Sequence, residues 1–241
     1  MPSHTAPSEP PSYRGYRYPI EIISHAVSLY LRFHLSLRDV EELLAERGVS
    51  VTYETIRAWC AKFGPQYAAN LRRRRARPAN KWHLGEVQLK IKGNRHWLWR
   101  AVDKHDVVLD ILVQQHRDQQ AAETVLRRVL AAAGSEPRVV ITDKLASYPP
   151  ALRRVLPNTE HRRHKGLNNR AENSHQPTRQ RERAMRRFKS PAQAQRFLGP
   201  FGAMGDHFRT GRYLAPAIAR RQLLAERRSA WREVVGLQTV A

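Results

Sequence analysis

The sequence predicts a mixed α/β domain preceded by a small all-helical domain, and three observations support this fold class. Between residues 20 and 63, apolar residues recur at the spacing of helices with one buried face. From residue 81 the pattern changes to the alternation of strands. The chain of 241 residues also has room for one domain of ordinary size and a second, smaller one.

The charge of the chain predicts a polyanionic partner. Lys and Arg number 43 against 21 acidic residues, a formal net charge of +22. Nucleic acid is the usual partner of such a chain, while an anionic membrane surface is disfavoured because the sequence has no apolar run of 18 residues. Cys60 is the single cysteine, which excludes an intrachain disulfide and disfavours a structural zinc site. The start lacks a signal-peptide apolar core, so we expect a cytoplasmic or nucleoid-associated protein.

Two segments are expected to lie outside the packed domains. Residues 1–17 are rich in Pro and Ser, which predicts a disordered tail. Residues 71–80 carry five arginines and are expected to be a basic linker, either simply solvated or in contact with DNA phosphates. The candidate phosphate-binding residues of this linker are Arg72, Arg73, Arg74 and Arg75.

Residues 18–70 are predicted to form a helix-turn-helix DNA-binding domain. After a first amphipathic helix, Ser36 is placed to cap a helix that ends at Gly48. Thr52 is placed to cap the next helix, which we expect to run to about Phe63. In a helix-turn-helix this last helix lies in the DNA major groove; the alternative is an ordinary helical hairpin. The candidate base-reading residues are Tyr53, Glu54, Arg57 and Lys62.

Residues 81–208 are predicted to form the α/β domain, and a C-terminal helical extension is expected over 209–241. Short turns between the first three strands predict antiparallel hairpins. A helix, a fourth strand, a short crossover and a fifth strand follow, which is also the element order of ribonuclease-H-like nucleases. The strands are expected at 82–91, 96–103, 107–114, 138–142 and 159–163, and the helices at 118–133, after 164, at 190–208 and at 214–236.

A strongly basic stretch from His164 to Ser190 stands out within this domain. It holds eight Lys and Arg residues but only two carboxylates, Glu172 and Glu182. Asn168 and Asn169 are placed to cap a helix whose first turn carries Glu172. Arg179 lies two helical turns further on nearly the same face, although Pro177 must kink or interrupt the helix between them. This pattern suits either a metal-assisted phosphodiester site or a basic helix that coats nucleic acid without chemistry.

Two further positions bear on a metal site. Asp143 follows an apolar strand, at the kind of strand end where α/β proteins place ligands, although a turn residue is the alternative. Alternation in the first strand puts Gly85 on the same side as Val87 and Leu89, facing the core or the site. Glu86 then points through the opposite face, unless a bulge at Gly85 re-aims it.

A resemblance to a known family extends from about Tyr13 to Gly236. It is carried by the segments KWHLGEV, HWLWRAVD, PRVVITDK and, most specifically, NNRAENSHQPTRQRE. These segments resemble bacterial insertion-sequence transposases of the insertion-sequence-six family, which belong to the DDE class. The resemblance implies an N-terminal helix-turn-helix that reads the terminal inverted repeats of the element, followed by a ribonuclease-H-like catalytic domain.

The resemblance also implies a catalytic set with two Mg²⁺ ions. Asp143 and Glu172 match the second and third metal ligands of the family, and Arg179 matches a basic residue expected on DNA phosphate. Other cations near these carboxylates are expected to contact phosphate as well. These cations are Lys144, Arg170 and Arg183. A homodimer or larger assembly on double-stranded DNA is expected, because two element ends must be brought together.

The departure from the family pattern falls at Gly85. The first catalytic aspartate of the family belongs at this position, in a WHL-Asp-Glu pattern that reads WHL-Gly-Glu here. Losing one of three ligands leaves a metal poorly held, so we expect cointegrate-forming strand cleavage and transfer to be impaired. The alternative is a catalytically inactive DNA-binding protein that occupies element ends or represses transposition.

Overall fold

The computed structural model describes residues 9–209 and 216–237, and the chain divides into two compact units. One unit contains the described residues up to Arg75 together with those from Gly199 onwards. The other runs from Ala76 to Leu198. The C-terminal extension that we expected from residue 209 is therefore part of the N-terminal unit, which takes in the chain from residue 199. Residues 1–8 of the expected tail lie outside the described residues.

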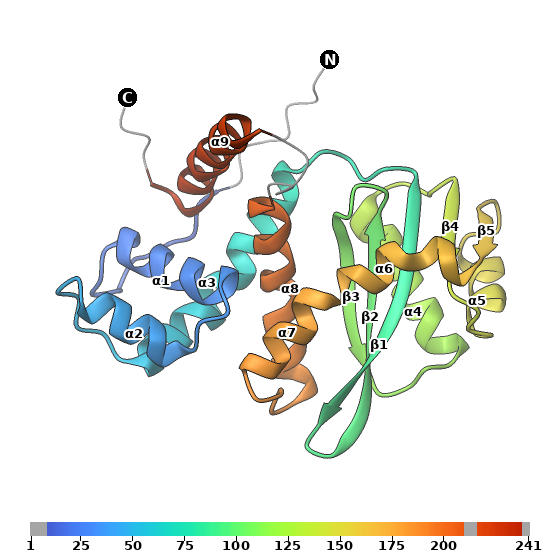
Figure 1. The fold of residues 1–241 in the computed structure, drawn as a ribbon, viewed down its shortest axis with the longest axis horizontal. Helices are drawn as coiled ribbons and strands as arrows, with labels where there is room; N and C mark the ends of the chain where they lie inside the picture. The colour runs from blue at the N-terminus through green and yellow to red at the C-terminus, as the bar shows by residue number, and fades with distance from the viewer. Residues whose placement is uncertain (1–8, 210–215, 238–241) are drawn as a thin grey trace. The chain divides into compact units, whose positions relative to one another are not determined.

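The helical unit contains the helix pair predicted from its capping residues (Figure 1). Ser36 Oγ accepts a hydrogen bond from the backbone N–H of Asp39 at 3.1 Å, and the Asp39 carboxylate accepts one from the N–H of Ser36 at 2.8 Å. Gly48 has a φ of +74°, the left-handed conformation that ends a helix. Thr52 caps the following helix. The helices of this unit are α1 (Ile20–Arg32), α2 (Leu37–Ala45), α3 (Tyr53–Arg74), the end of α8 (Pro191–Phe208) and α9 (Ala217–Val235).

Helix α3 is longer than expected, and this corrects the predicted linker. It continues through Pro65 to Arg74 instead of ending near Phe63. The extension is stable because Tyr67, Ala68 and Leu71 continue its buried face. Three of the four candidate linker arginines therefore lie in the last helical turn, and the connection to the second unit begins at the fourth, Arg75. These three helical arginines are Arg72, Arg73 and Arg74.

The described part of the expected tail is packed, which corrects the prediction of disorder for residues 9–17. The Tyr13 ring stacks on Phe63 with centroids 4.8 Å apart. Its hydroxyl lies 2.7 Å from that of Tyr67 and donates to the carbonyl oxygen of Val235 at 2.9 Å. Tyr67 also packs edge-on against Trp231 of α9. Aromatic burial thus joins the two ends of the chain within this unit.

The second unit is built on a five-stranded mixed sheet with the order β3-β2-β1-β4-β5. The first three strands pair antiparallel, as predicted from their short turns, whereas β4 pairs parallel with β1 and β5 parallel with β4. This confirms the predicted α/β, ribonuclease-H-like fold class. The strands are β1 (Lys81–Ile91), β2 (Asn94–Asp103), β3 (Val108–Gln114), β4 (Val139–Thr142) and β5 (Glu160–Arg163).

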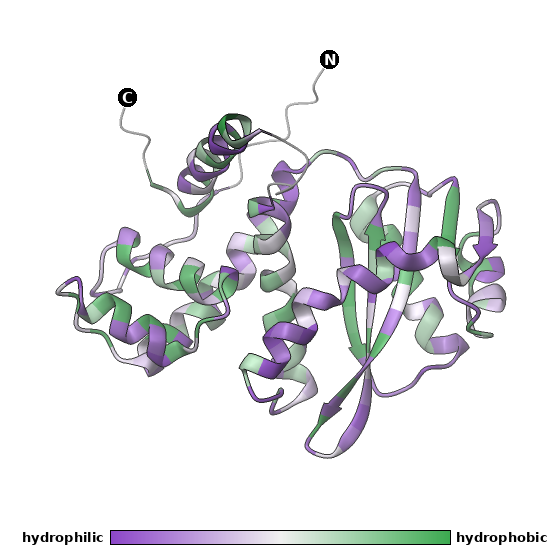
Figure 2. Cartoon of the chain, in the orientation of Figure 1, coloured by the Kyte–Doolittle hydropathy of each residue, from purple (hydrophilic) through white to green (hydrophobic). Residues whose placement is uncertain are grey.

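The two faces of this sheet have different coverings (Figure 1). One face packs against α4 (Gln119–Ala133) and α5 (Tyr148–Val155) around a core that includes Trp82, Leu84 and Trp99. The 3₁₀ turn η1 (Lys165–Asn168) leads into α6 (Asn169–Ser174), and α7 (Gln176–Ala184) follows. Helix α6 crosses the other face, where it contacts β1 and β2. Figure 2 shows that α6 and α7 are largely hydrophilic, whereas hydrophilic and hydrophobic residues are interspersed along β1.

Within the described residues, no helix is both long and apolar enough to cross a lipid bilayer.

Candidate active site

Gly85 is buried in β1 directly beneath α6. A Cβ atom at this position would lie 3.1 Å from the Cβ of Ala171, closer than side chains normally approach. Glycine therefore allows α6 to lie closer to the strand than an aspartate would, because Ala171 takes part of the space that a side chain needs. Ala171 precedes Glu172 in α6, so the helix that carries the predicted glutamate rests on the position that lacks the predicted aspartate.

Asp143 follows β4, the strand that lies next to the strand of Gly85. The parallel pairing of β1 with β4 ends where His83 lies beside Ile141. Gly85 follows two residues later within β1, and Asp143 follows two residues later, just past the end of β4. The Asp143 side chain is 31% exposed. One of its oxygens accepts a hydrogen bond from the N–H of Leu145 at 2.9 Å. The strand-end position predicted for Asp143 is thus present, and its carboxylate also shapes the turn after β4.

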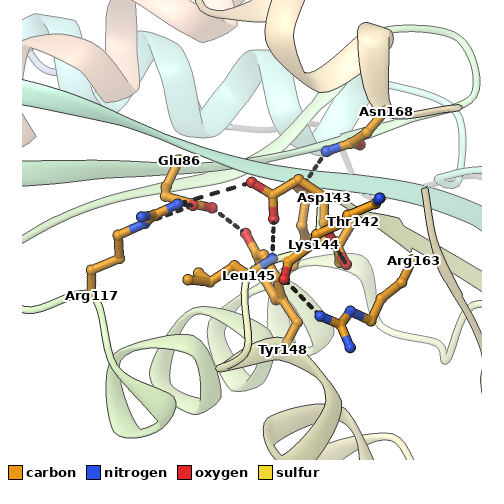
Figure 3. Close-up of polar contacts among 10 residues, drawn as sticks. Glu86, Arg117, Thr142, Asp143, Lys144, Leu145, Tyr148, Arg163 and Asn168 are labelled. Atoms are coloured by element: carbon orange, nitrogen blue, oxygen red, sulfur yellow. Dashed lines mark hydrogen bonds and ion pairs between the residues drawn. The ribbon is translucent and has the colours of Figure 1, made fainter. Parts of the chain in front are cut away.

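Glu86 points toward Tyr148 of α5 (Figure 3). A Cβ at Gly85 would instead meet Ala171 of α6, so the two residues face opposite sides of β1, as the alternation predicts. The pairing of β1 with β2 is continuous through both residues, so the alternative of a bulge at Gly85 is wrong. The Glu86 carboxylate accepts hydrogen bonds from Arg117 at 2.5 and 2.9 Å and from the Tyr148 hydroxyl at 2.7 Å. Burial raises the pKa of Glu86; the bonds from Tyr148 and Arg117 oppose this shift, and the nearby Asp143 adds to it.

Arg117 links the two carboxylates on this side of the site. Its Nη2 atom lies 2.5 Å from Glu86 and 3.9 Å from Asp143 Oδ2. The guanidinium also lies over the Trp97 ring, 4.6 Å from the centroid. Sequence reasoning missed Arg117, because it follows β3 in a segment with no motif and reaches Glu86 only through the tertiary fold.

Glu172 and Arg179 lie on separate helices. Glu172 is exposed in α6, Arg179 is exposed in α7, and the helices meet at His175. The predicted interruption by Pro177 is confirmed. The proline occupies the first turn of α7, where backbone N–H groups have no partner within the helix, so its lack of an N–H costs no helical hydrogen bond. Asn168 does not cap α6 with its side chain as expected; its amide nitrogen donates instead to the carbonyl oxygen of Leu84 at 2.7 Å.

Buried polar side chains surround Gly85 on the α6 side. Arg100 lies directly opposite Gly85 in the β1–β2 pairing, is 3% exposed, and donates to the carbonyl oxygen of Ser174. His175 is 4% exposed. Burial lowers the pKa of His175 to about 3, helped by the charges of Arg100 and Arg179 and opposed by the backbone of Gly85. At neutral pH the imidazole is therefore uncharged.

The described residues contain no group of three or more His, Cys, Asp or Glu side chains placed to hold a metal ion. Mg²⁺ takes oxygen ligands, and in-line transfer with two ions draws carboxylates from several elements. Asp143 and Glu172 supply such oxygens, but Gly85 supplies none, and Asp143 has Arg117 beside it. The residues present therefore do not fit a two-metal site.

The predicted DNA-contacting cations of this unit occupy different surroundings. Lys144 and Arg179 are exposed, whereas Arg170 forms an ion pair with Asp106 at 2.9 Å. Arg183 lines a shallow hollow of about 500 Å³ at the end of α7, within the basic stretch noted in the sequence. The other residues lining it are Glu182, Arg186 and Arg187, and both of these arginines have positive φ angles, +52° and +74°.

In the helical unit, the predicted base-reading residues form one cluster at the start of α3. Arg57 pairs with Glu54 at 2.6 Å and lies over the Tyr53 ring, 5.3 Å from its centroid. Lys62 is exposed further along the same helix. Two of the predicted linker arginines are engaged within this unit: Arg72 donates to the carbonyl oxygen of Gly199 at 3.1 Å, and Arg74 pairs with Glu233 at 2.6 Å. Their expected role on DNA therefore stays a prediction.

Comparisons with known proteins point to one family. Residues 79–211, more than half of the chain, match the DDE domain family of IS240-type transposases. The transposase for insertion sequence-like element IS431mec of Staphylococcus aureus strain Mu50 is 33% identical over 144 residues. The transposase for insertion sequence element IS257 in transposon Tn4003 of Staphylococcus aureus shows the same identity over the same length. Each match covers 60% of this chain and 64% of the relative, less than two thirds of its length.

A solved structure of the simian T-cell lymphotropic virus intasome in complex with PP2A regulatory subunit B56 gamma includes a chain that aligns with 91% of this one and 70% of its own length. The TM-score is 0.36 and the identity 15%. The family assignment depends instead on the match over 79–211, which contains Gly85, Asp143 and Glu172. This chain belongs to the DDE domain family of IS240-type transposases.

Proposed function

We propose that this protein is the transposase of a bacterial insertion sequence whose strand cleavage and transfer are impaired at Gly85. It binds double-stranded DNA at the terminal inverted repeats of the element and at the target. The observation that supports this proposal is the position of Gly85, in the strand next to the one that Asp143 follows and beneath the helix of Glu172.

The chemistry of the family explains the expected defect. In-line transfer of a phosphodiester by this class of enzyme would draw on Mg²⁺ held by carboxylates from several elements. Asp143 and Glu172 would supply carboxylate oxygens for it, whereas residue 85 carries no side-chain oxygen. Removing single catalytic groups lowers rates by orders of magnitude, so we expect end binding to persist while cleavage is slow or absent.

A second candidate function is a catalytically inactive DNA-binding protein. The contact between Ala171 and the Cβ position of Gly85 favours it, because α6 partly fills the space of the missing side chain. Such a protein would occupy element ends, repress transposition, or join mixed assemblies with an active relative. A homodimer or larger assembly on DNA is expected under both functions.

The test is Mg²⁺-dependent strand transfer of a mini-element by four forms of the full chain. These are the parent, Gly85→Asp, Gly85→Asn as a matched uncharged control, and Gly85→Asp combined with Ala171→Gly. We expect no transfer by the parent or the asparagine control, transfer by Gly85→Asp, and more transfer when Ala171→Gly relieves the 3.1 Å contact.

Two outcomes would contradict the proposal. Equal activity of the parent and Gly85→Asp would show that another carboxylate serves in place of the first ligand. Absence of transfer by both aspartate variants, with end binding intact, would favour the second function. As a further check, Asp143→Asn in the Gly85→Asp background should abolish transfer.

A further inference from the structure

We propose that Arg100, Asn168 and His175 form a receptor that positions a carboxylate at residue 85, and that this chain keeps the receptor around a glycine. The inference deepens the proposed function, since it depends on the assignment of position 85 to the first catalytic carboxylate. It adds positioning residues that act through that side chain. Their role is to orient the carboxylate of an aspartate at residue 85. One of its oxygens would accept their hydrogen bonds, and the other would stay available to the reaction centre.

The first argument is the short distance of two side-chain nitrogens from residue 85. From the Cβ position of residue 85, His175 Nε2 is 3.5 Å away and Asn168 Nδ2 is 3.8 Å away. The oxygens of an aspartate extend beyond Cβ, so a side-chain rotamer directed toward α6 can reach hydrogen-bonding range of these nitrogens. Amide nitrogen is always a donor, and imidazole Nε2 is a donor in one of its neutral tautomers. The surroundings of Gly85 therefore present donors to an acceptor.

The second argument is the cross-strand position of Arg100. Directly opposite residues of an antiparallel pair project from the same face with their Cβ atoms about 5 Å apart. Arg100 is thus the nearest neighbour of residue 85 on β2, and it is 3% exposed. Arg100 already donates to the carbonyl oxygen of Ser174, and an aspartate at 85 would add a charged acceptor close to the same buried guanidinium.

The third argument is an unmet hydrogen-bonding requirement. His175 is 4% exposed, and neither ring nitrogen makes a hydrogen bond to the described residues. Buried polar groups in proteins are nearly always paired, so a buried imidazole aimed at a glycine marks the place of an acceptor. The peptide of Gly85 lies near the ring without forming a bond of normal geometry.

Ala171 limits the space available for a side chain at residue 85. The methyl group of Ala171 would lie 3.1 Å from a Cβ at residue 85, so α6 must yield by a few tenths of an ångström to admit a side chain. Asp and Asn at residue 85 would be crowded by Ala171 to the same extent, because the Cβ atom is in the same place in both. A difference between the two variants therefore reports on the carboxylate and not on space.

The experiment compares the thermal unfolding of Gly85→Asp and Gly85→Asn in the full chain, without DNA and without Mg²⁺. A carboxylate held by charged and neutral donors is expected to raise the Tm by about 5 °C over the amide. The same pair is then measured with Arg100→Met and with His175→Phe. We expect the aspartate advantage to disappear with Arg100→Met and to shrink with His175→Phe.

A second measurement covers the case in which Arg100→Met fails to fold. The side-chain N–H resonances of Arg100 and Asn168 are compared by NMR in Gly85→Asp and Gly85→Asn. Downfield shifts in the aspartate variant alone support the receptor. Identical resonances in both variants, or a Tm for Gly85→Asp at or below that of Gly85→Asn, would overturn it.

The two proposals can fail separately. If Gly85→Asp is stabilised through Arg100 but transfers no strand, the receptor is supported and the proposed function is contradicted. If Gly85→Asp transfers strands without any stability advantage over Gly85→Asn, the function is supported and the receptor is contradicted.

Discussion

The carboxylate of Glu86 and the guanidinium of Arg117 form an ion pair across 31 positions of the chain, on the side of β1 opposite to α6. The Glu86 side chain is 0% exposed and that of Arg117 is 35% exposed. Breaking such a pair from one side leaves a buried charge without its counter-ion. The pair therefore contributes to stability as well as to the electrostatics around Asp143.

Arg117→Met should lower the free energy of unfolding by about 2–3 kcal/mol, the lower end of the range for buried pairs because Arg117 is partly exposed. Urea unfolding followed by circular dichroism measures this change. Adding Glu86→Gln should recover part of the loss, since it removes the buried charge. An unchanged unfolding midpoint in Arg117→Met would contradict the structural role.

His175 makes the stability of the α/β unit sensitive to acid. Its pKa is lowered to about 3 in the folded chain, mainly by burial, whereas an ordinary histidine titrates near 6.5. The unfolded chain therefore binds this proton first as pH falls. The stabilising contribution is complete above about pH 6.5 and is lost as pH falls toward 3, by at most about 1.4 kcal/mol per pH unit.

The measurement is the free energy of unfolding between pH 7 and pH 4. We expect a shallower dependence on pH in His175→Gln than in the parent. His105→Gln, at an exposed position of the same unit, is the matched control for the substitution itself. Equal slopes for the parent and His175→Gln would show that the imidazole is not buried as described.

Arg57 is expected to contact DNA from the start of α3. Arg57→Ala should weaken binding to element ends. If Arg57 contacts a phosphate, the substitution should also make the negative slope of log affinity against log salt concentration shallower by about 0.9. If Arg57 contacts a base edge, its loss would instead reduce the preference of the protein for element ends over other DNA. The control is Arg47→Ala, which removes one positive charge from an exposed position of the same unit, as Arg57→Ala does. Identical binding by the parent and Arg57→Ala would exclude the helix-turn-helix assignment.

Ser36 stabilises α2 through reciprocal hydrogen bonds with Asp39. Ser36→Ala should lower the free energy of unfolding of the helical unit by about 1 kcal/mol, because one N–H at the helix start loses its acceptor. Thermal unfolding measures this loss. Ser50→Ala, at an exposed position outside the helices, should have little effect.

Much of the fold could be predicted because its signals are local. Ser36 and Thr52 act within a few residues of themselves, and both helices start where they predict. Helix α2 ends at Ala45, slightly before the predicted end, and Gly48 lies in the turn that follows. The hairpins of β1, β2 and β3 follow from short turns and alternating residues. Alternation also placed Gly85 and Glu86 on opposite faces. The end of α3 was mispredicted because Pro65 suggests a break that the buried face beyond it overrides.

The sequence by itself determined the strand pattern, the helix caps and the basic charge, because each is a property of neighbouring residues or of composition. It also determined the glycine at residue 85, where the family resemblance leads us to expect an aspartate. Only the tertiary structure decided what surrounds that glycine. Ala171 covers it, Arg100 lies opposite it, and Arg117 holds the carboxylate next to it. These contacts join residues 15 to 86 positions apart, and they form only when the packing of sheet and helices brings those residues within van der Waals or hydrogen-bonding range.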